Sequence, residues 1–335
     1  MLLSLAAMAA LAAVTGACAN SGAAGDPLST HAAGRLQVVT TVSPITSIAA
    51  NVIGDLADVR GVVPEGTNSH TFDPAPSMAE VLERADIVFV NGLKLEEPTK
   101  KLAAKNMSSK AVLVSIGEQV LEPAQYKYDF SFPRSGGKPN PHLWTDPLLA
   151  KRYAEVVRDA MAKADPAHGR EYAANEAAFA ARVDRFDQAL RTAFATIPRD
   201  RRKLLTYHDA YAYFADDYGW TVIGAIQVSD FEDPTPKEVA ALIEQVRAER
   251  VPAIFGSEVF PSPVLEQIGR EAHVRYVDQL RDDDLPGRPG DPEHSWLGLM
   301  RADYLTITEA MGGDASALRD VPVDNVAVDK AVYPQ

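Results

Sequence analysis

The sequence contains one cysteine, and this scarcity restricts its chemistry. A single thiol, at Cys18, cannot form an intramolecular disulfide, and it cannot supply a multi-cysteine zinc or iron–sulfur site. Basic residues are also few, since 33 Lys and Arg stand against 46 Asp and Glu, for a net charge of −13. Such an acidic chain is a poor candidate for binding nucleic acid, and cations are its more compatible ligands.

The apolar run at the N-terminus is too short to span a bilayer comfortably. Residues 2–14 are mostly Leu, Ala, Met and Val, whereas a transmembrane helix needs about 20 apolar residues. The run fits the core of a signal peptide, although no Lys or Arg precedes Arg35 to give the usual positive start. We therefore expect an exported protein with a signal peptide at residues 1–17.

The residues that follow this run predict a lipid anchor. Thr15-Gly16-Ala17-Cys18 resembles a bacterial lipobox, in which the cysteine is lipidated and becomes the mature N-terminus. A cleaved signal with an incidental cysteine is the alternative. Residues 18–34 are rich in Ala, Gly and Ser and predict a flexible tether. The expected location is the outer face of the cell membrane, through the lipid, or the periplasm.

Common catalytic and nucleotide-binding motifs are also missing from the sequence. It contains no GxxxxGK[ST] loop, no GxGxxG fingerprint and no GxSxG elbow. Nucleotide hydrolysis, dinucleotide binding and serine hydrolase chemistry therefore lack their usual sequence support.

The chain has 335 residues, which suggests two domains at about 100 to 200 residues each. From Arg35 onward, short β-branched runs alternate with helical stretches, and this pattern predicts an α/β fold with mainly parallel sheets. Each half is expected to form one mainly parallel four-stranded sheet with flanking helices. The predicted strands are residues 38–42, 59–63, 86–90 and 111–115, then 203–207, 221–226, 253–256 and 274–277. Four helix starts are marked by a capping residue, at Ser43, Ser77, Asp146 and Thr235.

A long amphipathic helix is predicted between the halves, over residues 165–198. Its apolar positions are Tyr172, Phe179, Val183, Phe186, Leu190, Phe194 and Ile197. Their spacing of three, four or seven places them on one helix face, and the helix would extend roughly 45 to 50 Å. We predict an N-terminal lobe at residues 35–164, this rigid linking helix, and a C-terminal lobe at residues 199–335.

Three histidines and one aspartate follow predicted strands at the places where open α/β sheets bind ligands. They are His70, His142, His208 and Asp278. Two come from each half, so they can converge only between the lobes. Three imidazoles and a carboxylate form a tetrahedral set suited to zinc, whereas manganese prefers more oxygen donors. The spacing matches no short zinc motif. Considered alone, each of these histidines has the alternative interpretation of a capped surface residue that binds no metal.

The remaining histidines fall outside this pattern. His31 lies in the tether, and His168 and His273 are expected to have solvent or packing roles. Residues 281–294 form a Pro- and Gly-rich loop that holds three consecutive aspartates and His294. We expect this loop to be solvated, with assistance to metal entry as the alternative.

Several segments together resemble a known family. They are SHTFDPAPSMAEVLERADIVFVNG, NPHLWTDPLLAKRYA, TYHDAYAYFADDYGW, PTPKEVAALIEQVRAERVPAIFGSEVF and YVDQL. In this order they are similar to the cluster A-I solute-binding proteins, the zinc and manganese receptors of bacterial ABC importers. The resemblance implies two lobes bridged by a rigid helix, with a metal ion held between them and passed to a permease driven by a separate ATPase subunit.

The resemblance also implies a ligand set and a cargo. The family's ligand positions correspond to His70, His142, His208 and Asp278. Histidine at the third position is typical of zinc members, whereas manganese members tend to have a carboxylate there. Many zinc members carry a His-rich loop before the second ligand, but residues 122–141 contain no histidine. We expect a monomeric zinc receptor, with a manganese receptor as the alternative.

Two rival functions depend on other features. Glu258 follows a predicted strand and is expected to be a hydrogen-bond partner of a ligating histidine, or else an additional ligand. In a zinc hydrolase the same residue would act as general base towards a metal-activated water, but a bound Asp278 would close the open coordination position that catalysis needs. A surface adhesin of the same fold would need no metal. The resemblance favours a receptor without enzymatic activity over both.

Overall fold

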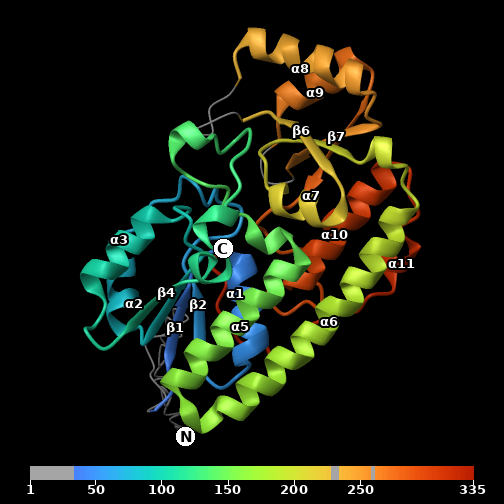
Figure 1. The fold of residues 1–335 in the computed structure, drawn as a ribbon. Helices are drawn as coiled ribbons and strands as arrows, with labels where there is room; N and C mark the ends of the chain where they lie inside the picture. Colours follow the sequence, from blue (N-terminus) through green and yellow to red (C-terminus); the bar gives the residue numbers. More distant parts are fainter. Residues whose placement is uncertain (1–33, 228–233, 258–260) are drawn as a thin grey trace, which may run out of the picture.

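The computed structural model describes residues 34–227, 234–257 and 261–335, which form two α/β lobes (Figure 1). The N-terminal lobe contains a parallel sheet in the order β2-β1-β3-β4. Its strands are β1 (Gln37–Thr40), β2 (Asp58–Gly61), β3 (Ile87–Val90) and β4 (Val112–Ser115). All four coincide with predicted strands.

Helices cover both faces of this sheet because both faces are apolar. Val39, Val88 and Val90 pack in one apolar cluster with the helices α2 (Met78–Arg84) and α3 (Glu97–Asn106). Their neighbours in the strands point the other way, as the two-residue period of a strand requires. They pack against α1 (Ser43–Ile53) and α5 (Pro147–Ala164). A short helix, α4 (Gly117–Val120), follows β4.

The C-terminal lobe has the four predicted strands, but they do not form the expected single sheet. Within the described residues they form two parallel pairs, β5-β6 and β7-β8, rather than one four-stranded sheet. The strands are β5 (Lys203–Thr206), β6 (Thr221–Ala225), β7 (Ala253–Ser257) and β8 (Arg275–Leu280). The helices are α7 (Ala212–Tyr218), α8 (Pro236–Glu249), α9 (Pro263–Ala272), α10 (Trp296–Ala310) and α11 (Ser316–Arg319). Both pairs have a register shift, which interrupts regular pairing.

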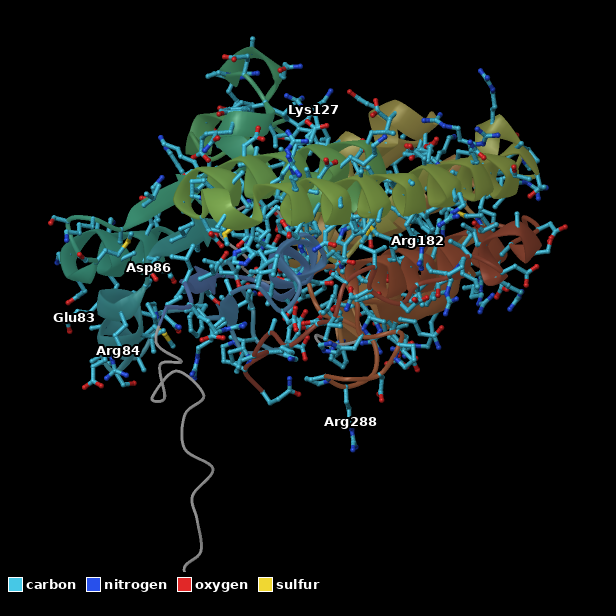
Figure 2. The ribbon with its side chains drawn as sticks, turned by 90° about the horizontal axis from the view of Figure 1, so that it is seen from below. Glu83, Arg84, Asp86, Lys127, Arg182 and Arg288 are labelled. Carbon is cyan, nitrogen blue, oxygen red and sulfur yellow. The ribbon has the colours of Figure 1, made fainter. Side chains whose placement is uncertain are left out.

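The predicted linking helix is confirmed as α6 (Gly169–Ala195), a helix of 27 residues that runs along the molecule (Figures 1 and 2). A 3₁₀ turn at Pro166–His168 precedes it, so the helix begins four residues later than the predicted segment. All seven predicted apolar positions are buried, although Ile197 lies two residues beyond the end of α6. The helix packs against α1 and α5 of the first lobe and against α10 and α11 of the second, so it supports both lobes.

Two of the four predicted helix caps are confirmed. The Asp146 carboxylate accepts a hydrogen bond from the Leu148 N–H, and Thr235 forms a capping box with Glu238. The prediction is wrong for Ser43, which is already the first residue of α1, and for Ser77, which has helical backbone angles and makes no capping hydrogen bond. A capping side chain normally needs an extended backbone to reach the free N–H groups of the first turn.

The C-terminal segment returns from the second lobe to the first. Val332 pairs with β2, donating to the Val59 carbonyl and accepting from the Gly61 N–H, both at 2.9 Å. Arg182, midway along α6 (Figure 2), donates to Asp324 on the way. The last residues of the predicted lobe 199–335 therefore lie on the edge of the N-terminal sheet. Among the described residues, no helix is long and apolar enough to cross a membrane.

Candidate metal centre

Three of the four predicted ligands meet between the lobes. His70 lies in a turn beyond β2, and His142 directly precedes a 3₁₀ turn at Leu143–Thr145, both in the N-terminal lobe. His208 follows β5 in the C-terminal lobe, two residues after the strand ends. His70 and His208 therefore lie in loops that leave the carboxyl ends of parallel strands, where α/β folds bind ligands, and His142 joins them from a longer segment after β4.

The ring nitrogens of these histidines point at one another. The Nε2 atom of His142 lies 3.1 Å from Nε2 of His70 and 3.2 Å from Nε2 of His208. One candidate ligand atom from each residue falls within 4.8 Å of the others. Zinc–nitrogen bonds of about 2.0 to 2.1 Å at tetrahedral angles separate ligand nitrogens by about 3.3 Å. The observed separations are close to that value, so the cluster has the dimensions of a metal site.

His142 and His208 are buried and His70 is half-buried, and this desolvation keeps the imidazoles neutral. Because desolvation disfavours the charged ring, it lowers the pKa of His208 to about 4. The pKa values of His70 and His142 are also lowered well below the ordinary value, first by burial and then by repulsion from neighbouring histidines. A neutral imidazole is the form that binds a metal ion. At neutral pH the cluster therefore presents three nitrogen donors without first having to lose protons.

Aromatic rings enclose the cluster on the side of the N-terminal lobe. The Phe132 ring lies 5.6 Å from His70 and 5.5 Å from His142, measured between ring centroids. The Trp144 ring lies 5.0 Å from His142. A cavity of about 210 Å³ adjoins His70 and is bordered by Phe132 and by residues of the loops at 93–95 and 131–141. This cavity gives solvent a path to the His70 side of the cluster.

The structure does not bring the fourth predicted ligand, Asp278, to the cluster. Asp278 is an exposed residue of β8. The carboxylate near the cluster is that of Asp282, which lies four residues further along and has an oxygen 3.7 Å from Nδ1 of His208. This contact is on the opposite side of the imidazole from Nε2. Asp282 is therefore placed to pair with the N–H of His208 rather than to join the three Nε2 atoms.

The acidic start of the loop at residues 281–294 is buried at residues 282 and 284–286, so the expectation that its aspartates are solvated is wrong, whereas residues 287–293 are exposed. Asp282 and Asp284 are 5% and 7% exposed, and Asp284 accepts a hydrogen bond from the Gly66 N–H in the N-terminal lobe. His294, at the end of the loop, has Nε2 3.1 Å from a Glu65 oxygen. Burial raises the pKa of Asp282 to about 7, and the charge of Asp284 adds to the rise. The two ends of the loop, at Asp284 and His294, are therefore contacts with the N-terminal lobe.

Sequence reasoning missed two residues beside the histidines. One is Asp282, because a run of three aspartates on a loop is usually solvated. The other is Asn140, whose side chain contacts His142. Its position two residues before the histidine, with a proline between, was the available signal. Glu258 and Cys18 lie outside the described residues, so their predicted roles stay predictions.

Two α/β lobes, a rigid connecting helix and a buried histidine cluster between the lobes define the class of bilobal solute-binding proteins. The chain belongs to the family described as zinc-uptake complex component A, periplasmic (ZnuA), whose model matches residues 38–310. The family description confirms the exported location expected from the N-terminal segment.

Individual relatives cover most of the chain. The "Iron-binding protein YfeA" of Yersinia pestis is 29% identical over 280 residues, which is 83% of this chain and 87% of the relative. The "Manganese-binding lipoprotein MntA" of Halalkalibacterium halodurans is 25% identical, over 82% and 88%. These names describe metal-binding proteins and not enzymes, in agreement with the expected absence of enzymatic activity.

A solved structure confirms the predicted fold. The periplasmic zinc-binding protein TroA of Treponema pallidum superimposes with a TM-score of 0.75 at 25% identity, covering 83% of this chain and 99% of TroA. The names of these relatives include iron, manganese and zinc, so they support metal binding as the shared property and not one metal.

Proposed function

We propose that this protein is the extracytoplasmic receptor of an ABC importer for a divalent transition metal, and that its cargo is zinc. The observation that supports the cargo is the set of three neutral imidazoles, whose Nε2 atoms lie 3.1 and 3.2 Å apart in two pairs. Family membership supports the receptor role and implies a permease and an ATPase as partners. The lipidation of Cys18 remains a prediction, and it would hold the receptor at the membrane beside the permease.

Zinc is favoured over manganese by the chemistry of the donors. Imidazole suits zinc, whereas manganese is better served by carboxylate, carbonyl and water oxygens. Within the described residues, the atoms gathered into one candidate metal group are all histidine nitrogens. A manganese or iron receptor is the second candidate, because relatives carry those metals in their names.

Competitive calorimetry of zinc and manganese on the chelator-stripped chain starting at Gly34 tests this assignment. We expect one zinc ion to bind tightly, manganese to bind weakly, and His208→Ala to lose most of the zinc affinity. His168→Ala is the matched control, since His168 is a half-exposed histidine paired with Asp165 far from the cluster. Tighter binding of manganese would overturn the zinc assignment, and an unchanged His208→Ala variant would overturn the ligand assignment.

Asp278 remains the proposed fourth ligand on the sequence resemblance, although the structure leaves it exposed on β8. Asp278→Ala decides the question in the same titration. A loss of zinc affinity comparable to that of His208→Ala would show that metal binding draws Asp278 to the cluster. An unchanged affinity would remove Asp278 from the ligand set and leave a site of three histidines.

A metal-free role as an adhesin predicts a different result. If binding to a surface partner were the only function, stripping the metal would leave both stability and partner binding unchanged. A zinc hydrolase predicts an exchangeable water on the metal, which spectroscopy of the cobalt-substituted protein would reveal.

A further inference from the structure

Asn140 is a fully buried amide that uses its whole hydrogen-bonding capacity. Its Nδ2 donates to a carboxylate oxygen of Asp129 and to the backbone carbonyl of Asp209, both at 2.7 Å. Its Oδ1 accepts from the backbone N–H of His142 at 2.9 Å and lies 2.9 Å from Nδ1 of the same residue. Burial without free donors or acceptors means that this amide has one stable orientation.

That orientation determines which nitrogen of His142 carries the proton. A carboxylate and a carbonyl accept hydrogen bonds only, so the amide nitrogen of Asn140 must face Asp129 and Asp209. The amide oxygen must then face His142, where Nδ1 can contact it favourably only as an N–H donor. Neutral His142 therefore carries its proton on Nδ1 and leaves a lone pair on Nε2. This is the nitrogen that lies 3.1 and 3.2 Å from the other two histidines.

The same amide connects the two lobes beside the cluster. Asp129 lies in the loop before His142 and is held by the backbone N–H groups of Ser131 and Phe132. Asp209 follows His208 directly, and its N–H donates to the Ser131 hydroxyl. Asn140 thus joins the segment that carries His142 to the segment that carries His208.

We propose that Asn140 is a positioning residue for metal capture. It holds His142 in the tautomer that exposes the Nε2 lone pair, and it sets the distance between the ligand segments of the two lobes. The inference rests on the metal-binding function proposed above and adds to it a residue that does not touch the metal. Hydrogen-bond partners of ligating histidines typically change metal affinity by about 10- to 100-fold.

The test compares Asn140→Ala and Asn140→Asp in the chain starting at Gly34. Nitrogen-15 NMR of the metal-free protein reports which His142 nitrogen is protonated, and calorimetry gives the zinc Kd. We expect the Nδ1–H form in the unsubstituted chain, loss of this preference in Asn140→Ala, and a zinc Kd about 10- to 100-fold weaker. Asn140→Asp keeps an acceptor for Nδ1–H, so it should keep the tautomer even if it lowers stability.

Asn51→Ala is the matched control. Asn51 is a buried amide that donates to the Ser47 carbonyl and accepts from the Val326 N–H, and neither partner lies in the histidine cluster. Its loss should lower the unfolding temperature without changing the tautomer or the Kd.

Protonation of His142 on Nε2 in the unsubstituted chain, or an Asn140→Ala Kd within threefold of normal, would overturn the inference. Absence of zinc binding by the unsubstituted chain would instead overturn the proposed function. In that case, the NMR spectrum of the metal-free protein would still show whether Asn140 determines the tautomer of His142.

Discussion

At the scale of single residues, Asp282 supplies His208 with a carboxyl partner. Its carboxylate lies 3.7 Å from Nδ1, on the side of the ring away from the cluster. A nearby carboxylate makes an imidazole a stronger metal ligand. We therefore predict that Asp282→Ala weakens zinc binding about 10-fold, as measured by calorimetry. Asp291→Ala, an exposed aspartate of the same loop, is the control and should leave the Kd unchanged. Equal affinities for the two variants would contradict the role of Asp282.

Asp303 should make the stability of the metal-free protein depend on pH. The Tyr211 hydroxyl lies 3.0 Å from Asp303 and 3.3 Å from Asp282, yet it has one proton to donate. Burial, and then the charge of Asp282, raises the pKa of Asp303 to about 7. A folded-state pKa above the unfolded value contributes stability at low pH, and this contribution is lost as the pH rises through about 7.

The expected change can be isolated with one variant. The pKa of Asp303 is about 7, and asparagine does not titrate. Between pH 5 and pH 8, the free energy of unfolding should therefore fall by about 2 kcal/mol more in the natural chain than in Asp303→Asn. Urea unfolding at the two pH values, with a chelator present, measures this difference. Parallel pH profiles for the two proteins would show that Asp303 does not titrate in this range.

At the scale of secondary-structure elements, α6 stabilises both lobes through its apolar face. Phe186 is fully buried in this face, and its ring lies 6.3 Å from that of Tyr304 in α10. Replacing a buried Phe by Ala typically costs about 3 to 5 kcal/mol. We predict a loss of this size for Phe186→Ala and less than about 0.5 kcal/mol for the exposed Gln188→Ala, measured by urea unfolding. Equal losses would mean that this part of α6 is not a structural support.

The elements themselves could largely be predicted from the sequence. Short apolar runs, most of them β-branched, marked all eight strands, and the spacing from Tyr172 to Ile197 marked α6, because both patterns depend on local periodicity. The pairing of the strands in the second lobe could not be predicted in this way. It depends on contacts between segments far apart in the chain, and the register shifts in both pairs leave no local signal.

The residues of the candidate site could likewise be predicted only in part. The three histidines were found because each lies in a loop after a predicted strand and in a segment that resembles the family's ligand motifs. The carboxylate near His208 was missed, since the turn after β8 decides which of Asp278 and Asp282 points inward. Asn140 was missed because the orientation of its amide depends on a hydrogen bond to Asp209, a residue of the other lobe.

At the scale of the whole molecule, the C-terminal segment joins the second lobe to the first. Val332 makes two backbone hydrogen bonds to β2, and Tyr333 is buried with its ring 4.6 Å from that of His294. Two backbone hydrogen bonds and one buried aromatic side chain together contribute about 3 kcal/mol. We predict that deleting residues 331–335 lowers the free energy of unfolding of the metal-free protein by about this amount. A deletion without effect would show that the segment only rests on the sheet edge.

Zinc should stabilise the whole molecule, because its proposed ligands come from both lobes. An ion that binds only the folded state adds about 2.7 kcal/mol at a free concentration one hundred times its Kd. The chain without residues 331–335 should gain as much as the full chain, since its histidine cluster is intact. His208→Ala should gain almost nothing at the same zinc concentration, because the C-terminal lobe has then lost its histidine ligand. Urea unfolding with and without zinc measures each gain, and a full gain in His208→Ala would place the stabilising zinc at another site.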